Sequence, residues 1–359
     1  MTHIAILCKT FLKGGAEKQA LILTKLLNER EINVCLINWY GNKIDKRNLK
    51  FISDNSFKYF PLSGNYIKKL IVFRKILKKE GISILISYLT LPNFVSGINR
   101  ILNRNIISIG GIRNDKLPFV KFLFEKLIHN YLNDATVFNN HSAKEKFITR
   151  GFNPAKIYVI QNAIDQKKSQ FEKNASNGEI KIVTVGRFVK QKDYTTALKA
   201  FSELVKRNKE KSFKYSVVGY GPLEKDIKLL AEVLKIDQNV NVIINPPDIH
   251  DILAKSDIFL STSLFEGVSN SIMEAMIAGL PVVATDVGDN KWLIKNGQNG
   301  FIVPCRDIDQ IVSKLEYLSG SEEIRKNFGQ TSINVIESEF SNSKFLENYL
   351  KLFSKFQKA

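Results

Sequence analysis

Short apolar runs alternate along the chain with longer segments in which apolar residues recur every three or four positions. Such runs are typical of buried strands, and the periodic segments between them are typical of helices that cover a sheet. In the first half of the chain the runs lie at residues 3–9, 32–40, 82–88, 105–110, 134–140 and 156–164. The alternation predicts stacked βαβ units, and therefore an α/β fold with a parallel sheet.

The second half of the chain repeats this pattern after a polar interval. Residues 166–178 have no apolar periodicity and are predicted to be a linker. Six further runs follow, at residues 180–186, 214–219, 241–245, 257–263, 280–288 and 299–303. Because 359 residues exceed one ordinary core, we expect two Rossmann-like, doubly wound domains, over residues 1–165 and 179–340. Residues 341–359 are predicted to form an amphipathic helix that packs on the second domain or crosses back to the first.

The composition is that of a globular protein, with 44% hydrophobic and 25% charged residues. The three cysteines are scattered without metal-ligand spacing, so we expect a reducing, cytoplasmic environment and no disulfide framework. The apolar run at residues 4–8 is too short for a signal-peptide core, and no run reaches the ~18 apolar residues that a spanning helix needs. We therefore expect a protein that is neither exported by a signal peptide nor integral to a membrane.

The net charge of +18 is concentrated in the first half of the chain. Residues 1–165 contain 26 Lys and Arg against 11 Asp and Glu, a net charge of +15, whereas the remaining residues contain 27 against 24, a net charge of +3. A basic domain suggests an anionic partner, either nucleic acid or an acidic membrane surface. A solvated, lysine-rich surface without a partner explains the charge equally well.

Residues 65–81 interleave cations with apolar positions and are predicted to form a basic amphipathic helix. Its cations are candidates for docking on an anionic membrane: Lys68, Lys69, Arg74, Lys75, Lys78 and Lys79. A helix between two strands must also pack on the sheet, so we expect its apolar face to turn inward and its basic face to turn outward. Residues 117–131 are a second candidate for membrane docking.

A glutamate interrupts the apolar helix predicted at residues 270–279. Apolar side chains cover nearly every direction around this helix, yet Glu274 lies in its middle. Burying an unpaired carboxylate costs on the order of several kcal/mol. Helix side chains lean toward the N-terminus, so the carboxylate points toward the preceding loop, which holds Glu266 and the free amides of residues 268–270. We therefore expect Glu274 to face a ligand with hydroxyl groups, beside a site suited to phosphate.

Two further loops at the predicted carboxyl ends of strands have phosphate-binding character. Gly14 and Gly15 precede a helix, where paired glycines let a ligand approach the backbone amides. Arg187 and Lys192 share the loop after the run at 180–186, and two fixed cations can hold a diphosphate. Each feature also has a plain alternative, a strand-to-helix turn for the glycines and surface charge for the cations.

Taken in order along the chain, these motifs resemble the retaining glycosyltransferases of family 4. The segments that carry the resemblance are Gly14–Glu17 (GGAE), Gln161–Asp165 (QNAID), Val185–Phe188 with Lys192, Val218–Leu223 (VGYGPL), and Glu266 followed eight positions later by Glu274. They span nearly the whole chain. The resemblance implies the GT-B fold, in which two Rossmann-like doubly wound parallel-sheet domains face a central cleft.

The resemblance also implies roles for single residues. Glu274 would accept hydrogen bonds from the ribose of a nucleotide-sugar donor, and Glu266 would lie beside the transferred sugar. Arg187 and Lys192 would neutralise the diphosphate leaving group, so the catalytic candidates are these two cations and Glu266. The implied donor-binding set is Gly14, Gly15, Arg187, Lys192, Val268, Ser269, Asn270 and Glu274. Because fixed cations and helix dipoles stabilise the developing charge, no metal or other cofactor is expected.

The first domain departs from the family pattern at one position. Many relatives carry a histidine there near the donor sugar, whereas the corresponding segments here read SYLTLPN and GGIRNDK. Tyr88, Arg113 and Asn114 are the candidates to contact the sugar or the acceptor in its place. His129 and His141 lie in or beside predicted helices and are expected to be structural.

The leading hypothesis is a retaining, metal-independent transfer of an N-acetylhexosamine or hexose from a UDP-sugar to a polyprenyl-diphosphate-linked or other glycan acceptor, in bacterial surface-glycan synthesis. Relatives that act on lipid-linked carriers dock through the first domain, which would place this protein at the inner face of the cytoplasmic membrane. One alternative is a UDP-sugar 2-epimerase of the same fold, with which the basic first domain conflicts. The other is a nucleic-acid-binding protein without enzymatic activity, but the chain has no recognisable nucleic-acid module, so no such partner is expected.

Overall fold

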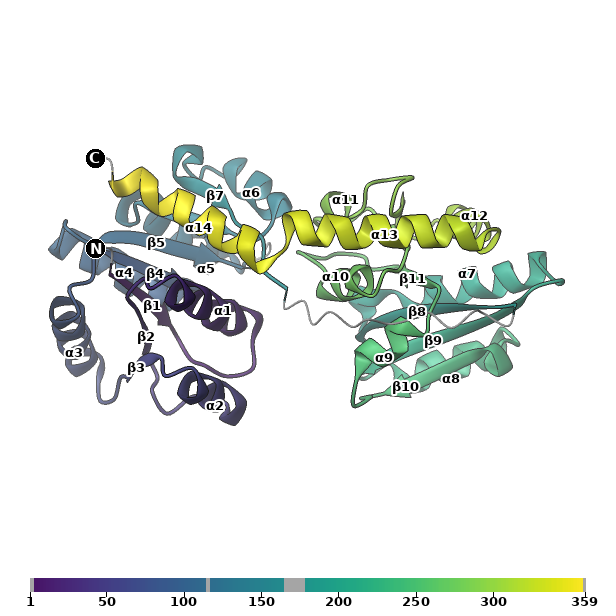
Figure 1. Cartoon of the computed structure of the whole chain (residues 1–359), viewed down its shortest axis with the longest axis horizontal. Helices are drawn as coiled ribbons and strands as arrows, with labels where there is room; N and C mark the ends of the chain where they lie inside the picture. The colour runs from purple at the N-terminus through teal and green to yellow at the C-terminus, as the bar shows by residue number, and fades with distance from the viewer. Residues whose placement is uncertain (1–2, 114–116, 165–177, 358–359) are drawn as a thin grey trace. The chain divides into compact units, whose positions relative to one another are not determined.

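The computed structural model describes residues 3–113, 117–164 and 178–357, which divide into two compact units (Figure 1). Unit 1 comprises Met1–Ala163 and Phe340–Ala359, and unit 2 comprises Ile164–Glu339. Apart from Gly178, the predicted linker lies outside the described residues, as does the candidate Asn114. Each unit is built on its own parallel sheet with helices on both faces, so the predicted pair of Rossmann-like domains is confirmed.

Unit 1 has a seven-stranded parallel sheet in the order β3-β2-β1-β4-β5-β6-β7. Its strands are β1 (Ile4–Cys8), β2 (Val34–Asn38), β3 (Lys58–Pro61), β4 (Ile84–Tyr88), β5 (Ile107–Ile112), β6 (Ala135–Phe138) and β7 (Ile157–Val159). Strand β3 was not predicted, because it is a short edge strand with half-buried or exposed side chains and ends in a proline. The chain reverses its direction across the sheet between β1 and β4, which is the place where doubly wound sheets bind ligands.

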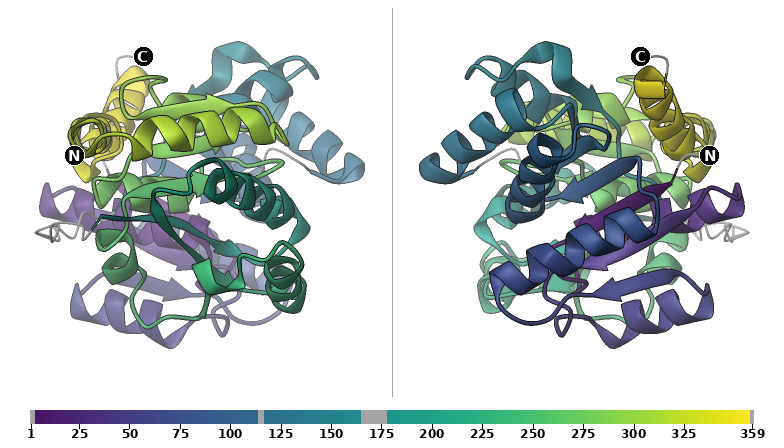
Figure 2. Two further views of the ribbon diagram at one scale, coloured as in Figure 1. Left: turned by 90° about the vertical axis from the view of Figure 1, so that its right-hand side faces the viewer. Right: turned by 90° about the vertical axis from the view of Figure 1, so that its left-hand side faces the viewer.

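The helices of unit 1 form two layers, one on each face of the sheet. They are α1 (Gly15–Glu29), α2 (Lys46–Asp54), α3 (Tyr66–Lys79), α4 (Thr90–Leu102), α5 (Phe119–Leu127), the π-helical turn η1 (Ile128–Leu132), α6 (His141–Ile148), the short η2 (Pro154–Lys156) and the C-terminal α14 (Asn342–Gln357). Ile4 and Ile6 of β1 pack in the core beneath α1, α2 and α14, whereas Ala5 and Leu7 pack in the core beneath α3 and α4. The right-hand view in Figure 2 shows α3 and α4 on the same side of the sheet.

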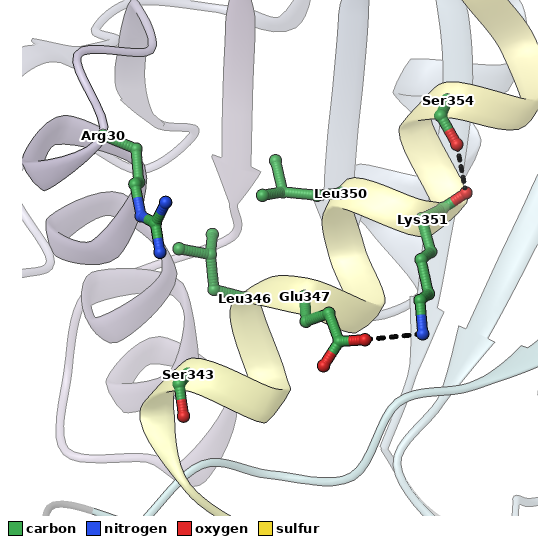
Figure 3. Close-up of a pocket in the computed structure, with 7 residues that line it drawn as sticks. All are labelled: Arg30, Ser343, Leu346, Glu347, Leu350, Lys351 and Ser354. Atoms are coloured by element: carbon green, nitrogen blue, oxygen red, sulfur yellow. Dashed lines mark hydrogen bonds and ion pairs between the residues drawn. The ribbon is translucent and has the colours of Figure 1, made fainter.

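The C-terminal helix α14 packs on unit 1, beside α1. It buries five large side chains in the same core as β1 and β4: Phe345, Leu346, Tyr349, Leu352 and Phe353. A shallow groove of about 390 Å³ runs along this helix pair, between Arg30 and residues of α14 such as Leu350 (Figure 3). Arg30 follows the last turn of α1, so the groove lies away from the carboxyl edge of the sheet, where ligands of doubly wound folds bind.

Two polar candidates in the first half of the chain contact Tyr349 of α14. The Tyr88 side chain is buried, and its hydroxyl lies 3.1 Å from the hydroxyl of Tyr349. The Arg113 guanidinium donates to Asn162 Oδ1 at 3.0 Å and to the Tyr349 hydroxyl at 3.3 Å, and it lies 4.6 Å from the Tyr88 ring centroid. Tyr88 is therefore a packing residue rather than a sugar contact, and Arg113 joins three distant parts of unit 1.

Helix α3 has the amphipathic character that the sequence predicts, with one exception. Phe73 and Leu77 are buried, and the candidate cations other than Lys69 are exposed. Lys69 is 7% exposed, and its ammonium lies 4.3 Å from the ring centroid of Tyr40. The prediction that Lys69 docks on a membrane is therefore wrong, because its charge is held against aromatic rings inside unit 1.

Unit 2 has a six-stranded parallel sheet in the order β10-β9-β8-β11-β12-β13. Its strands are β8 (Glu179–Arg187), β9 (Ser212–Tyr220), β10 (Val240–Ile244), β11 (Ile258–Ser261), β12 (Val282–Thr285) and β13 (Gly300–Val303). Its helices and helical turns are η3 (Lys190–Lys192), α7 (Tyr194–Arg207), α8 (Glu224–Val233), η4 (Asp237–Asn239), α9 (Ile249–Ala254), α10 (Asn270–Ile277), α11 (Asn290–Leu293), α12 (Ile308–Ser319) and α13 (Glu322–Glu339). The point of reversal lies between β8 and β11. None of the described helices in either unit is long and apolar enough to cross a membrane.

The buried His129 makes unit 1 sensitive to acid. Its ring nitrogens lie 2.8 Å from Thr136 Oγ1 and 3.0 Å from the Asn153 carbonyl, and burial lowers the pKa of the imidazole from its ordinary 6.5 to about 4. Between these two pKa values the unfolded chain binds a proton that the folded unit does not. The stability of unit 1 therefore falls as the pH falls through this window.

We predict that unit 1 loses about 2 kcal/mol of unfolding free energy between pH 7 and pH 5, and that His129→Gln removes most of this loss. The measurement is urea unfolding followed by the fluorescence of Trp39, in a Trp292→Phe background that leaves Trp39 as the sole tryptophan of the chain. An equally steep pH dependence in the His129→Gln protein would contradict the assignment.

Candidate functional site

The candidate site is built at the carboxyl ends of β8 and β11, which are neighbours in the sheet of unit 2. Several hydrogen bonds join the loops that follow these two strands. The Thr262 hydroxyl donates to the carbonyls of Lys192 and Asp193, each at 3.0 Å. Leu264 N donates to the Gln191 carbonyl at 2.8 Å, and the Gln191 side chain donates to the Phe265 carbonyl at 2.7 Å. The two loops therefore form one rigid segment, although 70 residues separate their hydrogen-bonded partners.

An ion pair joins the candidate residues Lys192 and Glu266 across these loops. Lys192 Nζ lies 2.6 Å from Glu266 Oε1, and the same oxygen accepts a hydrogen bond of 2.8 Å from the Ser263 hydroxyl. Both charged side chains are largely buried, with 15% and 10% of their surfaces exposed. Separating such a pair would leave two uncompensated charges in a largely buried place, which is unfavourable. The pair therefore keeps both groups in position at the edge of the sheet.

Helix α10 begins directly after this loop, and its sequence explains its position. Ile272, Met273, Ala275 and Met276 are buried, as the apolar pattern predicts, and Glu274 is half-buried in the second turn. The first turn of the helix presents backbone amides that have no intrahelical acceptor. Ser269 is buried at the N-cap, where its hydroxyl lies 3.2 Å from that of Ser271, and Asn270 is exposed. This end of α10 is suited to an anion.

A third loop holds the Glu266 backbone from the other side. Gly288, after β12, has a left-handed backbone with φ of +57°, and a Cβ atom there would lie 2.4 Å from the Glu266 carbonyl oxygen. The next residue, Asp289, donates its amide to the Gly267 carbonyl at 3.0 Å. Only glycine fits this close approach, so Gly288 is part of the site's framework.

Known proteins resemble this chain in sequence and in fold. Residues 165–335 match the family model described as glycosyl transferases group 1. A UDP-Gal:alpha-D-GlcNAc-diphosphoundecaprenol alpha-1,3-galactosyltransferase of Escherichia coli is 27% identical over 277 residues, which cover 69% of each chain. An N-acetylgalactosamine-N,N'-diacetylbacillosaminyl-diphospho-undecaprenol 4-alpha-N-acetylgalactosaminyltransferase of Campylobacter jejuni is 22% identical over 349 residues, or 91% of this chain and 93% of the relative.

Among solved structures, the Anabaena protein HepE in complex with UDP superposes with a TM-score of 0.82 at 14% identity, over 99% of this chain and 100% of that chain. These matches support a GT-B glycosyltransferase.

The remaining candidates lie at the end of β8 in unit 2 and at the start of α1 in unit 1. Arg187 is the last residue of β8, and its exposed guanidinium makes no hydrogen bond or ion pair with the residues that the structure describes. Gly14 is the N-cap of α1 and Gly15 its first residue. The Glu17 carboxylate fills the space that a Gly14 Cβ would need, and it accepts a hydrogen bond of 3.2 Å from the Thr10 hydroxyl. A Cβ atom added at Gly15 would have no other described atom within 4 Å.

Sequence reasoning missed the residues that hold the charged pair in place. Thr262 and Gln191 act through hydrogen bonds to groups about 70 residues away, and Ser263 acts through a hydrogen bond to the nearby Glu266 side chain. No spacing along the chain signals these contacts. The available signal was weaker: Thr262 and Ser263 are polar residues directly after a buried strand, at the edge where ligands bind.

Other polar groups near the edge have local tasks. An Asp-Xaa-Asp sequence occurs at Asp307–Asp309, a spacing found in metal-binding sites of other enzymes. Here Asp307 caps α12 by accepting from Gln310 N at 3.0 Å, and Asp309 pairs with Arg207 at 2.7 Å.

A pocket of about 410 Å³ opens between the first turns of α7 and α8. Its lining includes two cations and two carboxylates, Lys190, Arg306, Asp193 and Asp226, so it does not favour an anion over a cation.

We predict that Gly288→Ala disturbs the site more than Gly297→Ala does. Gly297 also has a left-handed backbone, with φ of +79°, but a Cβ there meets nothing within 4 Å. Both substitutions should lower the unfolding free energy by about 1 kcal/mol through backbone strain. Gly288→Ala should cost at least ~1 kcal/mol more, because the added methyl group displaces the Glu266 carbonyl. Urea unfolding of unit 2, followed by Trp292 fluorescence in a Trp39→Phe background, measures the difference, and equal losses would contradict the described contact.

Proposed function

We propose that this chain is a GT-B glycosyltransferase that transfers a hexose or N-acetylhexosamine from a UDP-sugar to a lipid-linked or polysaccharide acceptor, with retention of the anomeric configuration. The observation that carries the proposal is the Lys192–Glu266 pair, held at the point of reversal of the unit 2 sheet and directly before the N-terminus of α10. The names of the Escherichia coli and Campylobacter jejuni relatives specify diphospho-undecaprenol-linked sugars, which supports a lipid-linked acceptor. The UDP bound to HepE supports a uridine nucleotide.

The transfer requires groups that stabilise negative charge on the leaving nucleotide. The bond between C1 of the sugar and the diphosphate oxygen breaks, the acceptor hydroxyl oxygen bonds to C1, and the hydroxyl proton is released. The diphosphate takes the electron pair of the broken bond. Lys192, Arg187 and the amides of residues 268–270 would offset this charge without a metal ion. Glu266 already holds the Lys192 ammonium in place, so little reorganisation is needed when a diphosphate arrives.

Glu274 would fix the nucleotide through its ribose. The carboxylate is half-buried one turn into α10, where helix side chains lean back toward the N-terminal end. A carboxylate there can accept hydrogen bonds from two hydroxyl groups on adjacent carbons, such as the two of a ribose. The diphosphate would then lie at the first turn of the helix, beside Lys192.

We further propose that the protein binds peripherally to the inner face of the cytoplasmic membrane. Five of the six predicted docking cations are exposed on α3, and they belong to the more basic half of the chain: Lys68, Arg74, Lys75, Lys78 and Lys79. Each contributes about 1 kcal/mol near an anionic surface. A lipid-linked acceptor would be reached from that surface.

We predict that UDP raises the thermal unfolding midpoint of the protein, and that Glu274→Ala abolishes the rise. At about 100 times its dissociation constant, UDP should add about 2.7 kcal/mol of stability. Uridine should add less, because it lacks the diphosphate that Lys192 would contact. The measurement is differential scanning fluorimetry with UDP, uridine, ADP and GDP.

Glu316→Ala is the matched control for this experiment. Glu316 is a half-buried glutamate on α12 of the same unit, and it accepts a hydrogen bond of 2.9 Å from Asn208. Its loss should lower the midpoint without changing the rise that UDP produces. If no nucleotide stabilises the native protein, or if both variants lose the rise equally, the proposed donor site is wrong. Formation of a 2-epimer from the UDP-sugar without an acceptor would instead identify an epimerase.

A further inference from the structure

We propose that Asp193 is a positioning residue, whose left-handed backbone directs the Lys192 side chain to the Glu266 carboxylate. Asp193 is the single residue between η3 and α7, and its φ and ψ are +47° and +54°. A residue other than glycine adopts this conformation at a cost, and such strain persists where the surrounding structure enforces it. Lys192 is the cation that the proposed function assigns to the diphosphate, so the role of Asp193 rests on that function.

The left-handed conformation lets both neighbours of Asp193 reach the end of β8. The Lys192 side chain passes over the strand, because a Cβ atom added at Gly186 would lie 3.0 Å from Lys192 Cε. The Tyr194 hydroxyl donates to the Gly186 carbonyl at 3.0 Å. If η3 ran directly on into α7, Lys192 and Tyr194 would lie on opposite sides of one helix and could not both contact Gly186. The turn at Asp193 therefore sets the direction of the Lys192 side chain.

Hydrogen bonds from two sides hold Asp193 in this conformation. The Thr262 hydroxyl donates to the carbonyls of both Lys192 and Asp193, each at 3.0 Å. The Asp193 carboxylate caps α7, where it accepts from the Thr196 hydroxyl at 2.7 Å and from the Thr196 amide at 3.4 Å. Such local hydrogen bonds are the reason that aspartate tolerates a left-handed backbone. Arg306 Nε lies 3.9 Å from the same carboxylate, but its side chain is 72% exposed, so this pair adds little.

The backbone of Asp193, rather than its charge, explains its place beside Lys192. A carboxylate next to the cation that binds a diphosphate would repel the diphosphate, so the negative charge is unfavourable there. The conformation can be separated from the charge by substitution. Asparagine and glycine both lack the charge and both adopt the left-handed conformation, whereas the β-branched valine is a steric outlier in it.

The experiment is isothermal titration calorimetry of the full chain with UDP and with uridine. Asp193→Val should weaken UDP binding about tenfold, equivalent to one hydrogen bond to a charged group, and should leave uridine binding unchanged. Asp193→Gly and Asp193→Asn should bind UDP as the unaltered chain does. All three variants lack the carboxylate, so a loss confined to Asp193→Val reports on the backbone.

Lys235→Val is the matched control for backbone strain. Lys235 is an exposed residue after α8 of the same unit, and it also has a left-handed backbone, with φ of +58°. Its substitution should lower the thermal midpoint through the same steric conflict and leave the affinity for UDP unchanged. If Asp193→Val does not fold, Asp193→Ala makes the same comparison with a smaller side chain.

A double-mutant cycle tests whether Asp193 acts through Lys192. Lys192→Ala should weaken UDP binding by at least about tenfold, and Asp193→Val should add no further loss in the Lys192→Ala background. An additive loss, or equal losses for Asp193→Val and Asp193→Gly, would overturn the proposal. UDP affinity that Asp193→Val leaves unchanged would overturn the role of Asp193 alone. Failure of the unaltered chain to bind UDP would overturn the proposed donor site, and the role of Asp193 with it.

Discussion

The hydrogen bonds between the loops after β8 and β11 are the constraint on which the candidate site depends. Parallel strands place the loops that follow them at one edge of the sheet, but this alone leaves such loops free to move. Here the Thr262 hydroxyl and the Leu264 amide bind backbone carbonyls of the β8 loop, and the Lys192–Glu266 pair forms on the segment that results. The close approach of Gly288 to the Glu266 carbonyl then fixes the position of the Glu266 backbone. The N-terminus of α10 and the two charges are therefore held in place before any ligand arrives.

Much of this architecture could be predicted from the sequence, because parallel sheets buried on both faces leave a strong apolar pattern. The strand runs, the buried helix α10 and the loop charges at Lys192 and Glu266 follow from that pattern and from the rule that ligands bind at carboxyl edges. Strand β3 escaped prediction because an edge strand has no continuous apolar run. The sequence predicts a helix after residue 341 but does not decide whether this helix packs on the first or the second domain. Its packing on unit 1 depends on contacts with α1 that no local pattern contains.

The predictions for Tyr88 and Lys69 were wrong for the same physical reason. Each side chain contacts a partner from a distant part of the chain. Tyr88 ends a strand at the ligand-binding edge, as a sugar contact would, but Tyr349 lies 261 residues later and covers it. Lys69 belongs by spacing to the basic face of α3, but the aromatic rings of Trp39 and Tyr40 hold its ammonium inside the unit. In each case the tertiary contact decides whether a polar group meets solvent or the protein core.

The central claim is that a nucleotide binds on the joined loops of unit 2, and hydrogen–deuterium exchange with and without UDP tests it most directly. The account predicts slower exchange on UDP binding in peptides that cover residues 186–193 and 263–275, and no change in the helices α8 and α12. Protection confined to unit 1, or exchange that UDP leaves unchanged throughout unit 2, would contradict it.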